Sequence, residues 1–348
     1  MSKRKTVLYV SDTAQLWYKS GRLYYKSGEH AVSCVLQGSI MKRLLSRVRL
    51  FERLLRLSPR TSIRLDEHSF LISYDGKIYR WDVLANDLQV DHAFRKEMNN
   101  LLSFTRIEGV QGFDDSIVYG EYFMNPSRLP VAVWQRDQKG KWKATYQFEG
   151  NIIHIHAIVP DAVNGCVYIL TGDFGGEAAI WVARNNFKEV SPLQKGEQKY
   201  RGCVGFATKK GLLYATDAPT EPNALYLINS VGETTKIMDM PGPTIYGTEH
   251  KGIYYFATSV EPDTNLPTWR YFLSRKPGPG IKDNYTHVFA GNHESGFKEI
   301  VKYKNDVWPL TLFQFANVMF PECEMQNKVC FMPASVKKYD NVPVFLSV

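Results

Sequence analysis

The chain has 348 residues, of which 44% are hydrophobic, 13% aromatic and 22% charged. This composition is globular and excludes a disordered chain, and the 20 Tyr and 19 Phe favour strands, where aromatic rings pack well on a pleated surface. The formal charge of +8 predicts an anionic partner, which leaves an acidic glycan, a phospholipid surface and nucleic acid open.

The N-terminal stretch has a basic start followed by a predicted strand from Thr6 to Val10. About five apolar residues are too few for a signal peptide, and no run approaches the ~20 apolar residues of a transmembrane helix. We therefore expect a cytoplasmic protein, with peripheral attachment to the inner membrane left open. Its five cysteines form no C-x-x-C pair and are predicted to be buried thiols: Cys34, Cys166, Cys203, Cys323 and Cys330.

A helical pattern follows, because Leu44, Val48, Phe51 and Leu55 recur at helical spacing within residues 41–57. Six basic residues accompany the single acid Glu52: Lys42, Arg43, Arg47, Arg49, Arg53 and Arg56. We predict a basic amphipathic helix inserted at 38–58. Such a helix either lies on an anionic membrane or packs against the rest of the protein with its basic side in water.

A phrase of Gly or Asp, bulky apolar residues and Tyr recurs along the chain. Its copies are residues 75–79, 115–119, 165–168, 211–214 and 252–255, with partner strands expected at 131–134, 179–182, 225–228 and 270–273. Starts 40 to 50 residues apart match the length of a four-stranded propeller blade, although a β-sandwich is the alternative. We predict an all-β fold, a single β-propeller domain over 1–348, with seven blades favoured and six possible. The strands at Thr6–Val10 and Val344–Val348 are expected to share a blade and close the ring.

The loops after the Tyr-bearing strands concentrate the unusual polar residues. An acid recurs just past the strand in four consecutive units: Glu121, Asp173, Asp217 and Glu261. Equivalent propeller loops converge around one end of the central channel, so these acids are expected to face a common space, although each alone is also typical of a turn. Further candidates on these loops and beside them are Tyr122, Asn125, Glu177, Gln198, Glu221 and Asn223.

Two histidines, His154 and His156, occupy alternate positions of a predicted strand, which places both rings on one face about 6–7 Å apart. Such a pair is suited to acid–base chemistry or metal binding, or forms a hydrogen-bonded ladder in a polar channel. The sequence assigns no third ligand, so no metal site is predicted. Arg128 and Arg201 are candidate clamps for an acidic sugar, or partners in ion pairs with the acids.

Nucleic-acid binding is not expected, because the aromatic residues are spread through strands and the one basic cluster is confined to the helical segment. A phosphate-binding loop is not expected either. Gly175-Gly176 and Pro277-Gly278-Pro279-Gly280 lack the Gly-Lys-Ser/Thr ending that such a loop requires.

Residues 135–142, Gln-Arg-Asp-Gln-Lys-Gly-Lys-Trp, keep the Asp and Trp of an Asp-box, and residues 73–76 are a second, poorer match. The chain thus resembles the sialidase-type propellers with Asp-box (BNR) repeats. Residues 60–320 also resemble bacterial glycosyl-hydrolase-like propellers that accompany polysaccharide biosynthesis. This second resemblance is carried by residues 120–128, 154–156, 171–177, 196–201, 216–223 and 261–262.

The resemblance implies a carbohydrate-active propeller that binds or cleaves an anionic glycan or glycolipid intermediate. A hydrolase would use two of the loop acids as general acid and as nucleophile or base. A lyase would use His154 or His156 with Tyr200 to abstract the proton beside a uronate carboxylate held by Arg201. The alternative is a non-catalytic scaffold for glycan-assembly enzymes, docked on a membrane or on proteins. The cofactor stays unknown.

Overall fold

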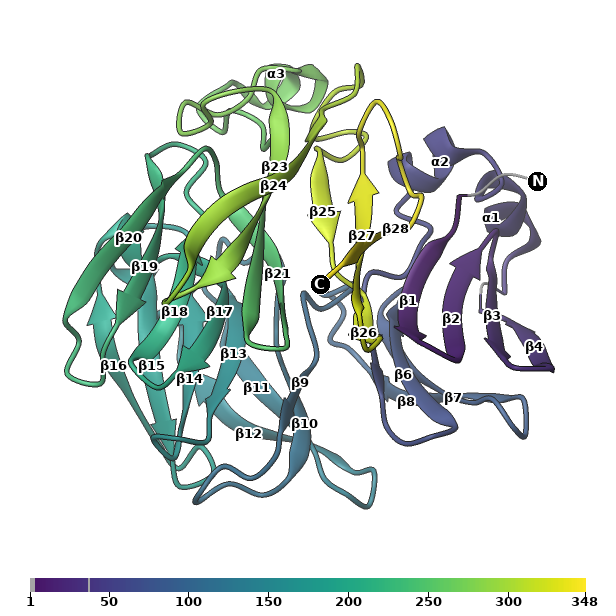
Figure 1. Ribbon diagram of the computed structural model, residues 1–348, viewed down its shortest axis with the longest axis horizontal. Coiled ribbons are helices and arrows are strands. Elements are labelled where there is room, and N and C mark those ends of the chain that lie inside the picture. The colour runs from purple at the N-terminus through teal and green to yellow at the C-terminus, as the bar shows by residue number, and fades with distance from the viewer. Residues whose placement is uncertain (1–3, 37) are drawn as a thin grey trace.

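The computed structural model describes residues 4–36 and 38–348, which form seven β-sheets around a central axis (Figure 1). Six of the sheets have four consecutive antiparallel strands, and the last has three. This is a seven-bladed β-propeller, which confirms the favoured blade count. The inner strands of neighbouring blades contact one another around the axis, as in the pairs β13–β17 and β17–β21.

The strands of the first four blades are β1 Thr6–Ser11, β2 Ala14–Lys19, β3 Arg22–Ser27 and β4 His30–Val35; β5 Ser62–Arg64, β6 Ser69–Tyr74, β7 Lys77–Asp82 and β8 Asp87–Ala93; β9 Thr105–Ile107, β10 Ser116–Gly120, β11 Val131–Arg136 and β12 Trp142–Phe148; and β13 Ile155–Asp161, β14 Cys166–Thr171, β15 Ala179–Arg184 and β16 Glu189–Lys195. Those of the last three are β17 Gly202–Thr208, β18 Gly211–Thr216, β19 Asn223–Ile228 and β20 Thr234–Met240; β21 Thr244–His250, β22 Ile253–Thr258, β23 Tyr285–Asn292 and β24 Gly296–Lys304; and β25 Asn317–Met319, β27 Lys328–Ala334 and β28 Val344–Ser347. The short strand β26 Glu322–Glu324 joins the first sheet. The helices are α1 Ile40–Leu45, α2 Arg49–Leu54 and α3 Thr268–Leu273, with single 3-10 turns η1 Gly175–Glu177 and η2 Gln198–Tyr200.

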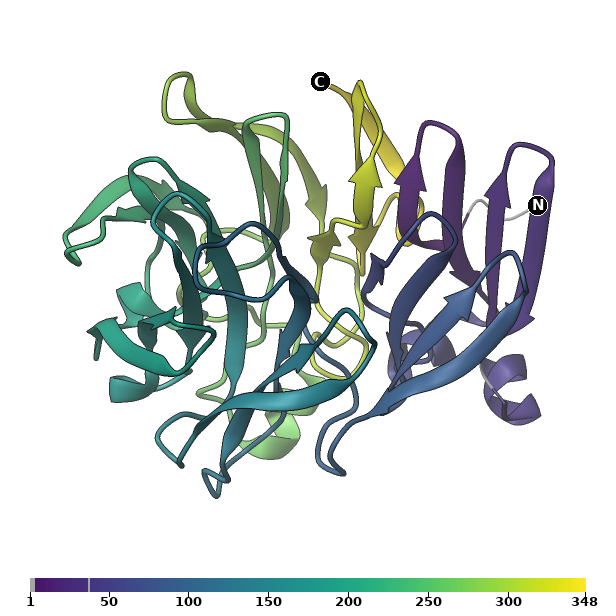
Figure 2. The same cartoon turned by 90° about the horizontal axis from the view of Figure 1, so that it is seen from below.

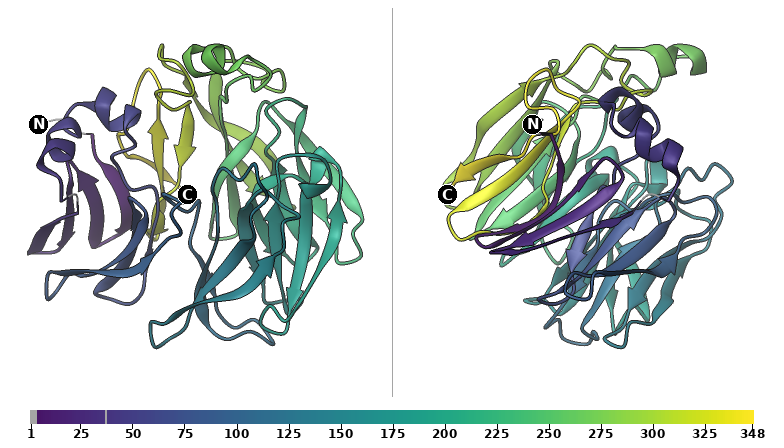
Figure 3. Two further views of the ribbon diagram at one scale, coloured as in Figure 1. Left: turned by 180° about the vertical axis from the view of Figure 1, so that it is seen from behind. Right: turned by 90° about the vertical axis from the view of Figure 1, so that its right-hand side faces the viewer.

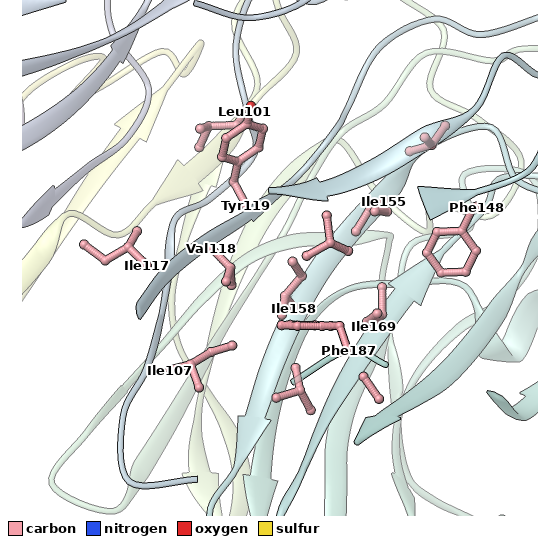
Figure 4. Close-up of a cluster of buried hydrophobic side chains, with 14 of the residues drawn as sticks. Leu101, Ile107, Ile117, Val118, Tyr119, Phe148, Ile155, Ile158, Ile169 and Phe187 are labelled. Atoms are coloured by element: carbon pink, nitrogen blue, oxygen red, sulfur yellow. The ribbon is translucent and has the colours of Figure 1, made fainter. Parts of the chain in front are cut away.

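The core lies between adjacent blades, because each sheet packs a face against the next. Second strands such as β14 are buried along their whole length, whereas every residue of an outer strand such as β16 is exposed or half-buried. Figure 4 shows one such interface, in which Tyr119, Ile155 and Ile169 pack together from three strands of two blades. Each fully buried aliphatic side chain of this kind contributes about 1.5–3 kcal/mol.

Ring closure differs from the expectation that the two terminal strands share a blade. Strand β1 is the innermost strand of the first blade, while β28 is the outermost of the last, beside β27. The two blades lie next to each other in Figures 1 and 2, joined where β26 pairs in parallel with β1. Closure thus comes from a short internal strand, because the N-terminal segment already supplies a complete four-stranded sheet.

Two of the predicted repeat segments belong to other structural elements than expected. Four copies of the Tyr phrase lie on second strands of their blades, but residues 75–79 lie on the turn and third strand of the second blade. Residues 270–273, expected as a strand, belong to helix α3, which starts directly after Pro267 within the long β22–β23 connection. The third strand of that blade is β23 instead.

The expected single helix at 41–57 is two short helices, α1 and α2, separated by an extended residue, Val48. Figures 1 and 3 place both helices at the same end of the molecule as α3. None of the helices in the described part of the chain is long and apolar enough to cross a membrane.

Candidate functional site

A pocket of about 690 Å³ lies where the loops of several blades converge at this helical end. Its floor includes Tyr122 from the third blade, Asp173 from the fourth, Arg201 and Asp217 from the fifth, and Glu261 from the sixth. Three of the four acids expected to converge therefore do so. Each of these three follows a second strand that ends in Thr, namely β14, β18 and β22.

Bulges in the innermost strands redirect two side chains near the pocket: Cys203 lines it, whereas His156 lies outside its lining and contacts Asp173, which lines it. In β13 and β17 the pairing with the second strand skips one residue, which is His156 in the fourth blade and Cys203 in the fifth. An extra residue of this kind bends the strand and redirects its side chain. His154, which immediately precedes β13, meets His156 with 2.8 Å between the two Nε2 atoms. The sequence predicted that both imidazoles lie on one face of the strand. Their Nε2 atoms are much closer together than the ~6–7 Å between alternate residues of a regular strand.

Asp173 reaches both imidazoles from the next loop. One carboxylate oxygen is 3.4 Å from Nε2 of His154, and the other is 3.2 Å from Nε2 of His156. Burial would raise the pKa of Asp173, but its contacts with the two imidazoles and the charge of Arg201 hold it well below its usual range. Burial lowers the pKa of His154. Gly172 makes this loop possible, because its φ is +86° and a Cβ there would lie 1.9 Å from the carbonyl oxygen of Glu177.

Arg201 lies between the acids of two blades. Its Nη2 is 3.0 Å from Asp173 Oδ1 and 3.4 Å from Asp217 Oδ2, and its Nη1 donates to the Asp173 carbonyl. Burial would lower the pKa of Arg201, but Asp217 and Asp173 raise it, so the guanidinium stays charged. Its Nε is buried and has no acceptor among the described residues. A buried donor of this kind is costly unless water or a ligand satisfies it.

Glu261 and Cys203 surround Asp217 on the pocket floor. Burial and the negative charge of Asp217 raise the pKa of Glu261 well above its usual range, and the Ser259 hydroxyl donates to Glu261 Oε1 at 2.7 Å. The Cys203 thiol donates to Asp217 Oδ2 at 3.1 Å, and burial with Asp217 raises its pKa. Glu261 is therefore a protonated acid beside a carboxylate, whereas Cys203 is a neutral thiol and a poor nucleophile.

A basic wall faces this floor and comes from the helical segment. Arg49, Arg56 and Arg60 all line the pocket. Burial, followed by the charges of Arg60 and Arg53, lowers the pKa of Arg56 to about 10. Sequence reasoning assigned this segment to the surface and missed its part in the pocket, because its contact with the blades is a tertiary feature.

Several predicted site residues lie outside the pocket, where they form hydrogen bonds and ion pairs within the fold. Glu121 is buried and accepts hydrogen bonds from the Ala132 backbone and the Trp134 indole, with Arg95 as its ion-pair partner. Its carboxylate faces its own blade instead of the channel, so it does not join the other three acids.

Arg128 and Glu177 form an ion pair with each other at 2.6 Å, and neither lines the pocket. Asn125 lies in the loop that follows β10. It fixes this loop through hydrogen bonds with the Leu129 backbone and the Ile153 carbonyl.

Of four further candidates, two lie outside the pocket and two line it. Tyr200 packs in a core cluster with Tyr168 and Tyr214 and does not line the pocket. Asn223 binds the backbone of its own loop, at Ala218 among other residues. Gln198 and Glu221 do line the pocket: Gln198 donates to the Asp173 carbonyl, and Glu221 lies exposed at the rim.

No family model matches the chain, and no curated protein matches it. Among solved structures, Raptor from Chaetomium thermophilum is 9% identical with a TM-score of 0.55, covering 100% of this chain and 28% of that one. The WD40 propeller of Doa1 is 9% identical with a TM-score of 0.53 and covers 98% and 93%. An oligogalacturonate lyase in complex with manganese is 10% identical with a TM-score of 0.47 and covers 91% and 92%. At these identities the likeness shows the propeller fold alone, and the expected sialidase type is not shown.

Proposed function

We propose that the pocket binds an anionic saccharide and performs acid–base chemistry on it. The observation that supports this proposal is the meeting of an arginine wall and a buried carboxyl pair in one pocket. Its volume of about 690 Å³ is in the range of small-molecule sites. The polar groups of the floor suit a ligand with many hydroxyls. The positively charged arginine wall suits a ligand with at least one negative group.

The arginine wall argues for the negative charge of the ligand. Burial is the main cause of the lowered pKa of Arg56, and the positive charge of Arg60 contributes to it. A carboxylate or phosphate between the two arginines would relieve the repulsion of their charges and accept charge-assisted hydrogen bonds. Arg201 also lines the pocket and adds a positive charge between Asp173 and Asp217.

The carboxyl pair favours elimination over hydrolysis. Glu261 lies within hydrogen-bonding reach of Asp217, whereas the two carboxyls of glycoside hydrolases are about 5 Å or more apart. In an elimination, the Asp217 carboxylate takes the proton beside the sugar carboxylate. Glu261 gives its own proton to the departing glycosidic oxygen, so that a C–O bond breaks and a C=C bond forms. Tyr200, the base expected from the sequence, has no part in this proposal because it lies in the core.

The test uses oligosaccharides that carry uronate, sialate or phosphate groups, with a neutral oligosaccharide for comparison. Ultraviolet absorbance of unsaturated products identifies elimination, and new reducing ends without that absorbance identify hydrolysis. We expect Glu261→Gln to lose turnover by about 10²-fold or more while binding is kept. We expect Arg60→Ala, which changes an exposed residue, to weaken binding about tenfold.

The matched control is Arg128→Ala, which removes an arginine that pairs with Glu177 outside the pocket. It should leave affinity within about twofold. Binding of the neutral oligosaccharide as tightly as the acidic ones, or no effect of Arg60→Ala, would refute the anionic specificity.

A second candidate function is supported by the orientation of helices α1 and α2. Their arginines turn inward: Arg49 pairs with Asp340, Arg53 pairs with Asp306, and Arg56 donates to the Thr311 carbonyl. Their apolar side chains face the solvent instead, and those of α3 do the same. The exposed apolar side chains in and beside the three helices, together named the apolar surface, are Ile40, Met41, Leu44, Val48, Phe51, Leu55, Trp269, Phe272 and Leu273.

We propose that this apolar surface inserts into the interface of an anionic membrane. Exposed Arg47, in the turn between α1 and α2, and exposed Arg270 of α3 would meet the lipid phosphates. Trp269 is 65% exposed, and an exposed indole of this kind is typical of membrane interfaces. Because Arg56 and Tyr271 line the pocket, a docked protein would hold its pocket beside the bilayer, where a glycolipid head group would lie.

Co-sedimentation with phosphatidylglycerol-containing vesicles and with neutral vesicles tests the membrane role. We expect binding to the anionic vesicles that is lost in the double variant Leu44→Glu/Trp269→Glu. Val231→Glu is the matched control, because Val231 is 75% exposed in the hairpin at the other end of β19 from the pocket. Failure of wild-type protein to bind anionic vesicles at low salt would eliminate this role and leave the saccharide proposal standing.

A further inference from the structure

The two buried histidines are held by backbone carbonyls in one defined protonation state. His154 Nδ1 lies 3.2 Å from the Phe123 carbonyl oxygen, and His156 Nδ1 lies 3.1 Å from that of Gly202. A carbonyl oxygen only accepts, so each Nδ1 must carry a hydrogen. A neutral imidazole has a single N–H, which leaves a lone pair on both Nε2 atoms.

These two lone pairs converge with a carboxylate. The Nε2 atoms are 2.8 Å apart, and the Asp173 oxygens lie 3.2 and 3.4 Å from them. Two lone-pair nitrogens and a carboxylate at such distances repel one another unless a cation lies among them. The two Asp173 distances match the ~3.0 to ~3.4 Å between neighbouring ligand atoms that are each ~2.1 Å from a metal ion, and the Nε2–Nε2 distance is slightly shorter.

We infer that His154, His156 and Asp173 bind one divalent first-row transition-metal ion. Two imidazoles and one carboxylate form a ligand set that such ions favour, whereas Ca²⁺ and Mg²⁺ prefer oxygen ligands alone. The inference is independent of the saccharide proposal, because it concerns the ion itself.

The surroundings of the three ligands are those of a metal site. The carbonyls of Phe123 and Gly202 fix the imidazole tautomers, and Arg201 holds Asp173 Oδ1 at 3.0 Å. Such outer contacts orient metal ligands in proteins. Asp173 also lines the pocket, so positions not taken by the protein would be open to a water molecule or a ligand oxygen.

The competing occupant is a second proton, shared between the two Nε2 atoms as an imidazole–imidazolium pair. The two cases differ in what the protein carries. A metal ion is retained in a fixed stoichiometry and is removed by a chelator, whereas a shared proton follows the pH alone.

The experiment treats the full chain with a chelator, removes the chelator, and titrates the protein separately with Zn²⁺, Mn²⁺ and Co²⁺. Calorimetry and elemental analysis give the stoichiometry, visible absorbance reports Co²⁺ coordination, and thermal unfolding reports the stabilisation by the ion. We expect one ion per chain, and about a 100-fold or greater loss of affinity in Asp173→Asn. His92→Ala is the matched control, because His92 bonds Tyr119 outside the pocket, and it should bind the ion like the wild type.

Circular dichroism establishes whether Asp173→Asn is folded. If it is not, wild-type stabilisation by the ion and the imidazole ¹⁵N chemical shifts still decide the question. Unchanged affinity in folded Asp173→Asn would overturn the inference. So would a folded wild-type chain that binds none of the three ions while its ¹⁵N shifts report a shared proton.

Discussion

At the scale of single residues, the pocket buries an acid, Glu261, in surroundings that disfavour its charged form. Glu261 has a pKa well above its usual range because of burial and the Asp217 carboxylate. The folded protein therefore keeps a proton that the unfolded chain releases above about pH 4.5, and stability falls as the pH rises beyond that value. Acids held in this state are typical of functional sites.

We predict that Glu261→Gln stabilises the protein at neutral pH by about 1–3 kcal/mol, because the amide carries no ionisable proton. The gain should disappear at about pH 4, where the unfolded wild type also holds its proton. Urea unfolding across this pH range measures both values. Glu221→Gln changes an exposed acid at the pocket rim and should stay within about 0.5 kcal/mol of the wild type.

Single residues also show why some site predictions failed. Glu121, Asp173, Asp217 and Glu261 occupy similar places after their strands, so the sequence treats them alike. The difference is that Glu121 has the Trp134 indole and the Ala132 amide within its own blade, and these bonds turn it away from the channel. A partner on a neighbouring strand is a tertiary feature that a local pattern does not contain.

At the scale of elements, helix α2 is attached to the propeller by its basic residues. Arg49 makes a bidentate ion pair with Asp340, which lies in the loop between β27 and β28. Its Nε donates to Oδ2 at 2.8 Å and its Nη2 donates to Oδ1 at 2.9 Å. Burial would raise the pKa of Asp340, but the hydrogen bonds and charge of Arg49 lower it. The contribution of this pair to stability is therefore present above the ordinary Asp pKa and is lost as the pH falls through the lowered value.

We predict that Arg49→Ala lowers the free energy of unfolding by about 3–5 kcal/mol, because it leaves a buried carboxylate without its partner. Arg47→Ala, in the same segment but exposed, should change stability by no more than about 0.5 kcal/mol. Denaturant unfolding of the two variants checks this contrast. Equal effects would mean that α2 is not fixed by this ion pair.

The bulged inner strands are the elements that build the site. The period-two pattern of residues 152–159 predicts strand β13 and places both histidines on one face. The bulge at His156 then brings the imidazoles together, and the bulge at Cys203 supplies a thiol to the same floor. A bulge depends on pairing with the next strand, so alternation along one strand does not reveal it.

At the scale of the whole molecule, the ring closes through β26, and Glu322 lies at that junction. The backbone N–H of Arg64 donates to Glu322 Oε2 at 2.7 Å, and residue 322 pairs with Tyr9 of β1. Burial raises the pKa of Glu322 to about 7. The folded state therefore binds a proton between about pH 4.5 and 7 that the unfolded state does not, and closure weakens across this window as the pH rises.

We predict that the wild type loses roughly 2–3 kcal/mol more than Glu322→Gln between about pH 4.5 and pH 8. Unfolding curves at several pH values give the slope for each protein. Glu67→Gln, an exposed acid of the second blade, is the control and should keep the wild-type slope. Parallel curves for the wild type and Glu322→Gln would show that this junction does not titrate.

The sequence by itself predicted the propeller, favoured seven blades over six, and indicated three of the acids in the pocket, because these follow from local periodicity and from equivalent positions in repeated units. Only the tertiary structure decided which strands close the ring, that Arg49, Arg56 and Arg60 belong to the pocket, and that Asp173 lies against two histidines. These features depend on contacts between blades and between the helical segment and the ring. Such contacts join residues far apart in the chain, and their geometry comes from packing, which no local pattern encodes.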